Sequence, residues 1–253
     1  MRNKLIAYGL GILCHLSFGA AIVLMAYMLA TGLTHGIFPL GGNQGRVFNI
    51  FLILQFPIIH SFFLTKTGSK ILMLPFPKEI AKDLLTTSYA LVASIQLLIV
   101  FLFWTPNSIV WFAPSSLIVV PWFMIYGLSW LLLIKSLSEA GLAMHTGWLG
   151  WHSVTNGKKI IYPNLPREGL HGQCRHPIYL SFLLIILTAP VWSFDHFLLA
   201  SIWVLYCILG PKLKERRTHQ RLGDRYLEIK ESIPYMIPKH INLCSNQKRF
   251  RRS

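Results

Sequence analysis

Acidic residues are scarce in this chain. Only 9 of its 253 residues are Asp or Glu, against 24 Lys and Arg, which gives a formal net charge of +15. Charged residues make up 13% and apolar residues 53%, and the mean hydropathy is +0.50. A soluble domain of this size is much less apolar. The basic residues stand in short runs between apolar stretches and form no basic face with interleaved aromatics, which argues against a nucleic-acid partner. The composition therefore indicates an integral membrane protein surrounded by lipid.

Cysteine is also rare, and the few cysteines are far apart. The four are Cys14, Cys174, Cys207 and Cys244. No CxxC pair occurs, so neither a zinc site nor a disulfide framework is indicated, and we expect reduced thiols. The ten histidines are equally dispersed. Because a solitary histidine is more often a hydrogen-bonded structural residue than a ligand, we predict no metal site.

Apolar runs long enough to cross a membrane dominate the chain. The predicted spans are residues 5–29, 47–64, 84–104, 109–134, 178–189 and 194–213. The fifth is short for a hydrocarbon core of about 30 Å, so we expect it to tilt or dip with support from its neighbours. The sequence thus predicts an all-α, polytopic integral membrane protein with about six transmembrane helices.

The distribution of Lys and Arg predicts the orientation. Positive residues precede the first span and follow the second, fourth and sixth, whereas the intervening loops carry almost none, Arg46 being the exception. By the positive-inside rule both termini face the cytoplasm. We expect a bacterial inner membrane or its equivalent.

Three parts of the chain are distinguished by composition. Residues 1–164 hold the first four spans and the start of a long cytoplasmic loop, residues 165–238 form an apolar hairpin flanked by polar clusters, and residues 239–253 are a basic tail suited to anionic lipid. The loop 66–82 is basic, with an interfacial piece at 71–76. The polar stretch 135–175 is rich in Gly, Pro and Asn, which opposes a long helix, and we interpret it as a lid.

One polar side chain stands out within the second span. His60 interrupts an apolar run together with Gln55 and Pro57. Polar groups at membrane depth usually face the bundle interior or a functional cavity. Two interpretations are open, a hydrogen bond between helices and a role in a pocket.

Two polar clusters flank the hairpin of residues 178–213. In the first, Pro177 suits the first turn of a helix, whose free N–H groups favour an anion that Arg175 could clamp. The alternative is that Arg175 and His176 only anchor the helix at the lipid headgroups. The second cluster holds four of the nine acids, Glu215, Asp224, Glu228 and Glu231. Folding of the hairpin is expected to bring the two clusters together at one membrane face.

The order RHPxY, apolar hairpin, ER, LGxxY and a proline-bounded end resembles the isoprenylcysteine carboxyl methyltransferase superfamily. It is most similar to the branch of the methanethiol S-methyltransferases and nitrite-reductase-associated membrane proteins. The resemblance implies an S-adenosylmethionine-dependent methyltransferase whose acceptor is a small thiol such as methanethiol. It leaves open a methyltransferase for isoprenylcysteine carboxyl groups or lipids, a non-catalytic membrane helper, and a membrane reductase of related architecture.

The resemblance also implies site residues. Cofactor-binding positions are Leu165, Gly169, His171, Arg175, His176, Pro177, Tyr179, Glu215 and Tyr226. His171 stands where the family usually has tyrosine, and Lys214 where it commonly has the first of two adjacent acids. A thiol acceptor must become a thiolate before it attacks, and the candidates to assist are His60, His176 and Arg216.

Overall fold

The protein is almost entirely helical, as the sequence predicts. A computed structural model describes residues 1–38, 40–107 and 109–238, so the basic tail 239–253 lies outside the described residues. The longer helices are α1 (Arg2–Ala30), α2 (Gly42–Phe63), α5 (Leu85–Leu102), α6 (Val119–Glu139), α10 (Pro177–Leu187), α11 (Phe194–Leu222) and α12 (Asp224–Ser232). Shorter helices are α3 (Lys66–Met73), α4 (Lys78–Ala81), α7 (Leu142–His145), α8 (Trp148–Asn156) and α9 (Leu170–Gln173). Two short strands, β1 (Val110–Phe112) and β2 (Trp192–Ser193), pair antiparallel.

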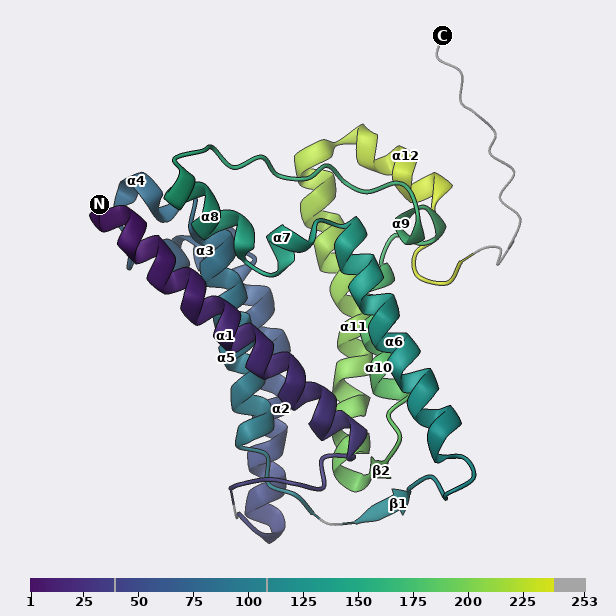
Figure 1. The fold of residues 1–253 in the computed structure, drawn as a ribbon. Helices are drawn as coiled ribbons and strands as arrows, with labels where there is room; N and C mark the ends of the chain where they lie inside the picture. The colour runs from purple at the N-terminus through teal and green to yellow at the C-terminus, as the bar shows by residue number, and fades with distance from the viewer. Residues whose placement is uncertain (39, 108, 239–253) are drawn as a thin grey trace.

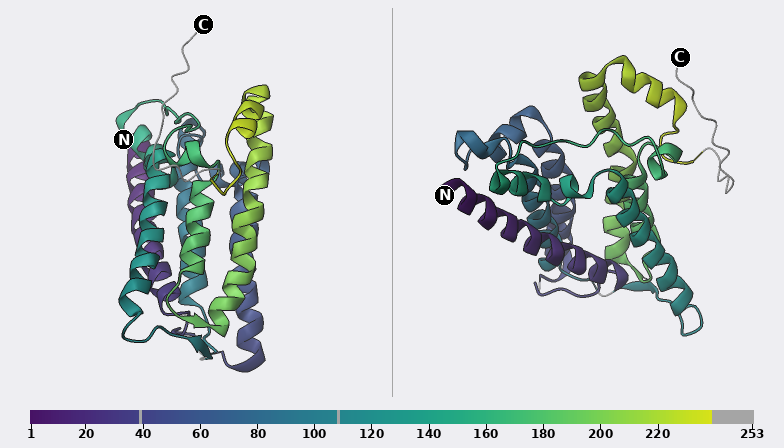
Figure 2. Two further views of the ribbon diagram at one scale, coloured as in Figure 1. Left: turned by 90° about the vertical axis from the view of Figure 1, so that its right-hand side faces the viewer. Right: turned by 45° about the horizontal axis from the view of Figure 1, so that its top comes forward.

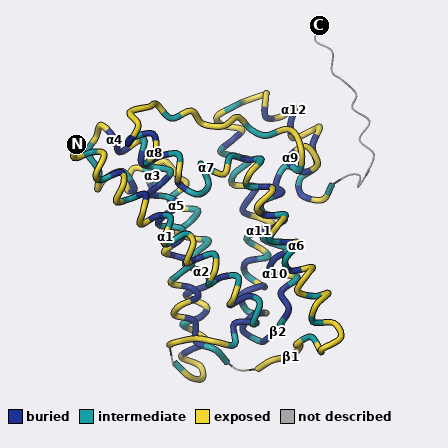
Figure 3. The backbone as a smooth tube through the Cα atoms, viewed as in Figure 1, coloured by how far each residue is buried: buried dark blue, intermediate teal, exposed yellow. Residues whose placement is uncertain are grey.

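Membrane-spanning length is reached by five helices of the described chain, namely α1, α2, α5, α6 and α11. Many of their large apolar residues are exposed, as expected where lipid is the solvent. Exposed positions recur along these helices in Figure 3. The fifth predicted span corresponds to α10, which has only 11 residues. Hydroxyl–hydroxyl hydrogen bonds hold this short helix against α6. One joins Ser136 and Ser181 at 3.3 Å, and the other joins Ser129 and Thr188, the C-cap of α10, at 3.1 Å. The expected support from neighbouring helices is therefore present.

The helices form two groups that lie side by side. Helices α1, α2 and α5 make one group, and α6, α10 and α11 make the other (Figure 1). The start of α1 and the helix α12 lie at one end of the molecule, and the β1–β2 ribbon lies at the opposite end (Figures 1 and 2). We call the first of these the α12 end. The N-terminus and α12 lie at this same end, which agrees with an even number of membrane crossings between them.

Two predicted boundaries are wrong. The span predicted at residues 109–134 begins instead with strand β1, and its helix starts at Val119 because Pro114 and the two serines after it interrupt the apolar run. The last span does not stop at residue 213. Helix α11 continues through Pro211 to Leu222, since the residues after 213 are mostly good helix formers such as Lys, Glu, Arg and Gln.

The largest hydrophobic core joins the two helix groups in the half of the molecule nearer the ribbon. Trp104 and Phe101 at the end of α5 are fully buried there, and the indole of Trp203 donates to the carbonyl of Ile53 at 3.1 Å. Tyr126 donates to the carbonyl of Ala26 at 2.9 Å. Residues 140–175, in which only the short helices α7, α8 and α9 form, lie at the α12 end (Figure 1).

Candidate functional site

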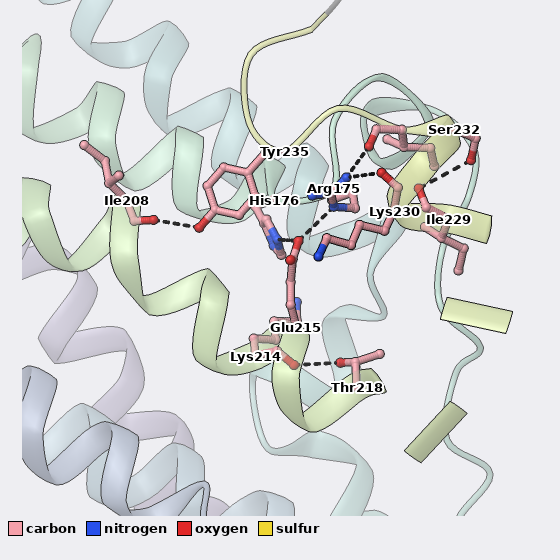
Figure 4. Close-up of polar contacts among 11 residues, drawn as sticks. Arg175, His176, Ile208, Lys214, Glu215, Thr218, Ile229, Lys230, Ser232 and Tyr235 are labelled. Atoms are coloured by element: carbon pink, nitrogen blue, oxygen red, sulfur yellow. Dashed lines mark hydrogen bonds and ion pairs between the residues drawn. The ribbon is translucent and has the colours of Figure 1, made fainter. Parts of the chain in front are cut away.

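The two polar clusters predicted to meet do meet, at the α12 end. Glu215 Oε1 accepts hydrogen bonds from Arg175 Nε and His176 Nε2, each at 2.8 Å (Figure 4). The side chains of Arg175 and Glu215 are only 9% and 12% exposed. Removing either member of such a poorly exposed pair would leave the other charge desolvated and unpaired, which strongly destabilises the folded state.

Arg175 also ties down the chain that follows α12. Its Nη1 donates to the carbonyls of Lys230, at 2.7 Å, and Ile233. Its backbone N–H donates to the carbonyl of Pro234 at 2.9 Å, and its guanidinium lies over the ring of Tyr235. The anion expected beside Arg175 is therefore the chain's own Glu215, and Arg175 joins α10, α11 and α12.

His176 stands at the N-terminus of α10, with Pro177 in the first turn as the sequence predicts. It is 3% exposed, and burial lowers the pKa of its imidazole to about 4 although the bond to Glu215 opposes this. The ring is therefore neutral near pH 7 and its Nε2–H donates to Glu215. Its Nδ1 has no partner in the described chain. The ring of Tyr235 packs against the imidazole, with the two ring centroids 5.0 Å apart.

Tyr226 connects this network to a cleft. Tyr226 is buried in a small apolar cluster against which Leu165 packs, and burial together with the nearby Glu215 carboxylate raises the pKa of its hydroxyl. Leu165 in turn lines a cleft of about 1000 Å³. The cleft is lined by residues 162–169 and by Glu139, Arg221, Leu222 and Arg225.

Gly169 closes one wall of this cleft. Its φ of +59° is a conformation that suits glycine, and an added Cβ would overlap the Glu139 carboxylate. That carboxylate accepts from the N–H of Leu170 at 2.8 Å. Of the predicted cofactor-binding residues, Leu165 and Gly169 thus line the cleft directly.

His171 faces the protein interior. Its Nε2 lies 3.1 Å from the carbonyl of Ser136 on α6, and burial lowers its pKa. Lys214 acts electrostatically on His171, His145 and His176. The lysine at this departure from the family pattern is therefore partly buried and within electrostatic reach of three histidines.

His60 belongs to a second group of polar residues, farther from α12. Its Nε2 lies 2.6 Å from the hydroxyl of Tyr89 on α5, and its ring stacks on Phe56. Next to it, the Ser61 hydroxyl lies 3.3 Å from that of Tyr206 on α11. The hydrogen bond between helices, one of the two interpretations of His60, is thus present. A pocket role is compatible with it, because Nδ1 of His60 has no partner in the described residues.

Arg216 and Arg217 lie on different sides of α11. Arg216 is exposed, whereas Arg217 is partly buried and its charge acts on Tyr179, Tyr206 and His60. The arginine that faces the polar interior is therefore the neighbour of the one predicted. Sequence reasoning also missed Tyr89 and Tyr206. Helical spacing could have found Tyr206, because it shares a face with Gly210, Lys214 and Arg217.

Comparison with known proteins gives a consistent set of relatives. The chain is 28% identical over 199 residues to methanethiol S-methyltransferase 1 of Bradyrhizobium diazoefficiens, covering 77% of this chain and 67% of the relative. It is 23% identical to the methanethiol S-methyltransferase of Crocosphaera subtropica over 63% of each chain. With the enzyme of that name from Mycobacterium tuberculosis it shares 24% over 79% of this chain and 80% of the relative. No protein-family model and no solved structure matches. The similarity to methanethiol S-methyltransferases that the motif order predicts is confirmed.

Proposed function

We propose that this protein is a membrane methyltransferase that uses S-adenosylmethionine to methylate a small thiol, with methanethiol as the leading acceptor and dimethyl sulfide as the product. The observation that carries the proposal is the cleft of about 1000 Å³ at the α12 end, bounded by the motif residues Leu165 and Gly169. The relatives named methanethiol S-methyltransferase support the reaction.

The cleft suits the proposed donor in size and charge. Sites for ligands of this size commonly enclose about 300–1000 Å³. Arg221 and Arg225 on one wall can bind the donor's carboxylate, and Glu139 and Glu168 on the other can bind its ammonium group. The donor supplies a methyl group activated on a sulfonium. The protein has only to align donor and acceptor and to exclude water, so little acid or base machinery is needed.

The network of Arg175, His176 and Glu215 supports this cleft from behind. It fixes the start of α10, with Pro177 and Tyr179, against α11 and the end of α12. Tyr226 then holds Leu165 at the cleft wall. We propose that Arg175 and Glu215 act on donor binding through this placement. Loss of either is expected to weaken binding while the protein still inserts into the membrane.

The α12 end is proposed to face the cytoplasm. The basic residues between the apolar spans favour this orientation by the positive-inside rule. The donor would then reach the cleft from the compartment in which it is made.

Calorimetry on the detergent-purified protein, with S-adenosylmethionine and NADPH titrated separately, tests the proposal. We expect saturable binding of S-adenosylmethionine and none of NADPH, with dimethyl sulfide formed from methanethiol in a sealed-vial assay. In the double variant Arg221→Gln/Arg225→Gln, donor affinity should fall about 10- to 100-fold, because charge-assisted hydrogen bonds contribute about 1.5–3 kcal/mol. Arg216→Gln, on α11 with Arg221 but outside the cleft, is the control for the loss of an exposed positive charge.

The other outcomes identify the rival functions. NADPH binding without S-adenosylmethionine binding would establish a reductase. No binding of either would favour a non-catalytic helper. If the protein binds the donor and methylates an isoprenylcysteine carboxylate or a lipid but no thiol, its acceptor is of that class instead.

A further inference from the structure

A set of polar side chains lies inside the helix bundle, apart from the residues that line the cleft. It meets the network around Glu215 where the ring of Tyr179 packs edge-on against His176, with ring centroids 6.0 Å apart. We call it the polar cluster. It comprises His60 and Ser61 of α2, Tyr89 of α5, Tyr179 of α10, and Tyr206 and Arg217 of α11. Four helices far apart in sequence contribute to it, so the cluster exists only in the folded bundle.

Three tyrosines, Tyr89, Tyr179 and Tyr206, belong to this cluster. Tyr179 and Tyr206 flank Gly210, where an added Cβ would lie 3.4 Å and 3.2 Å from their rings. Each of these two tyrosines acts electrostatically on Tyr89, whose hydroxyl is bound to His60. Gly210 thus lets both rings pack closely against α11. All the members are partly exposed rather than fully buried.

Arg217 is the charge of this cluster, and it lacks a carboxylate partner. Among the described residues, the ion pairs join Glu139 to Lys135, and Glu215 to Arg175 and His176. Residues 239–253 contain no Asp or Glu. Lys214, one helical turn away and also partly buried, has no acidic partner in the described chain either. Two partly buried cations without a counter-ion favour the binding of an anion.

We infer that Arg217, with the hydroxyls of Tyr179 and Tyr206, binds the methyl acceptor as its thiolate. The inference rests on the proposed function and specifies how the acceptor is activated. A simple alkyl thiol is mostly protonated at pH 7, since even the more acidic cysteine thiol has a pKa of about 8.5. A fixed cation and hydroxyl donors stabilise the thiolate and lower that pKa.

The reaction is balanced without any further reagent. The thiol releases its proton to water as its sulfur binds beside Arg217. A lone pair of that sulfur forms a bond to the methyl carbon while the bond from this carbon to the sulfonium sulfur breaks, and the bonding pair stays on the departing sulfur. The products are two neutral thioether groups, and the charge of Arg217 is again free. No protein group is oxidised or reduced.

The other groups around Arg217 do not supply this negative charge. The titratable or charged groups near it are His60, Tyr89, Tyr179, Tyr206, Cys207 and Lys214. None is a carboxylate. The Nε2 of His60 is bound to the Tyr89 hydroxyl, so His60 positions that hydroxyl. Arg217 is the residue that contacts the acceptor sulfur.

Proton release on acceptor binding tests the inference without turnover. Methanethiol is titrated into protein saturated with S-adenosylhomocysteine, in buffers of different ionisation enthalpy at pH 7. We expect the wild type to release about one proton per bound thiol, because the free thiol is protonated at pH 7 and must lose its proton to bind as thiolate. Arg217→Gln should release less than half as much, and Arg217→Lys should restore part of the release. Arg216→Gln, the same charge loss one residue away on an exposed position, should match the wild type.

Kinetics provide a second measurement. In Arg217→Gln the KM for methanethiol should rise at least about tenfold, corresponding to about 1.4 kcal/mol. The acidic limb of kcat/KM against pH should move up by about one unit or more, with donor affinity within about twofold of wild type. Unchanged proton release and an unchanged pH profile in Arg217→Gln would overturn the inference while leaving the proposed function intact. A wild type that binds the donor but methylates no thiol would refute the proposed function itself.

Discussion

The pair of Arg175 and Glu215 allows a quantitative test of how the site is built. In the single variants Arg175→Ala and Glu215→Ala, one mostly buried charge loses its partner. Breaking a buried pair in this way costs about 3–5 kcal/mol, because the remaining charge stays desolvated. In the double variant neither charge remains. Its cost should therefore be well below the sum of the two single costs.

The expected interaction energy follows from the contacts. A charge-assisted bond contributes about 1.5–3 kcal/mol, and Arg175 and Glu215 share one at 2.8 Å. The double variant still loses the Arg175 bonds to the carbonyls of Lys230 and Ile233, and the bond from Glu215 to His176. We therefore expect a residual cost in the double variant and an interaction energy of about 1.5–3 kcal/mol between the two sites.

Reversible unfolding in mixed detergent micelles measures the four free energies of unfolding, and calorimetry measures donor affinity on the same samples. Non-interacting sites give additive costs within about 0.5 kcal/mol. Additive costs would refute the reasoning that the two charges form one buried unit. Ser232→Ala, at an exposed position near the end of α12, is a control for general destabilisation of that segment.

Three further changes have expected outcomes. Burial lowers the pKa of His176 to about 4, below its unfolded value near 6.5, so the unfolded state binds more protons between these two pH values. The free energy of unfolding should therefore rise with pH from about 4 to 6.5, by up to about 3 kcal/mol. His176→Gln should flatten that slope when unfolding is measured as a function of pH. Gly169→Ala should lower the free energy of unfolding by more than about 1 kcal/mol and weaken donor binding. Gly157 shares a positive φ but has open space around it, so Gly157→Ala should lower stability without changing donor affinity. Equal donor affinities in the two variants would contradict this. Tyr235→Phe removes a 2.7 Å hydrogen bond to a helix carbonyl and should cost about 1 kcal/mol in thermal unfolding while the ring still covers His176.

Features that depend on local composition could be read from the sequence. The apolar runs predict the membrane helices because each must satisfy its backbone hydrogen bonds internally and match the bilayer thickness. Pro177 predicts the start of α10 through its fixed φ and missing N–H. The two polar clusters could be expected to meet because they border the two arms of one hairpin.

Features that depend on helix phase and on the choice of interaction partner could not be read from the sequence. The orientation of Arg216 and Arg217 follows only once α11 is known to continue past residue 213. The buried residues Trp203, Cys207 and Gly210 then set a helical phase that turns Arg217 inward and Arg216 outward. In the same way, Arg175 looks free to clamp a ligand until the fold places Glu215 and three backbone carbonyls around it.

The heights of the two polar groups along α11 suit a donor and an acceptor that arrive from different solvents. Glu215 lies 21 residues beyond Phe194 at the ribbon end of α11, which at 1.5 Å per residue is about 32 Å, close to the full hydrocarbon thickness. Tyr206 lies only 12 residues along, at about 18 Å, within the hydrocarbon layer. The cleft beside Arg221 is then at the aqueous surface, where a charged donor can enter. A small apolar thiol partitions into lipid and can reach the polar cluster from the side. Arg217 lies 23 residues along α11, at about 35 Å, between Tyr206 and the cleft residue Arg221, which is where the donor and the acceptor would meet.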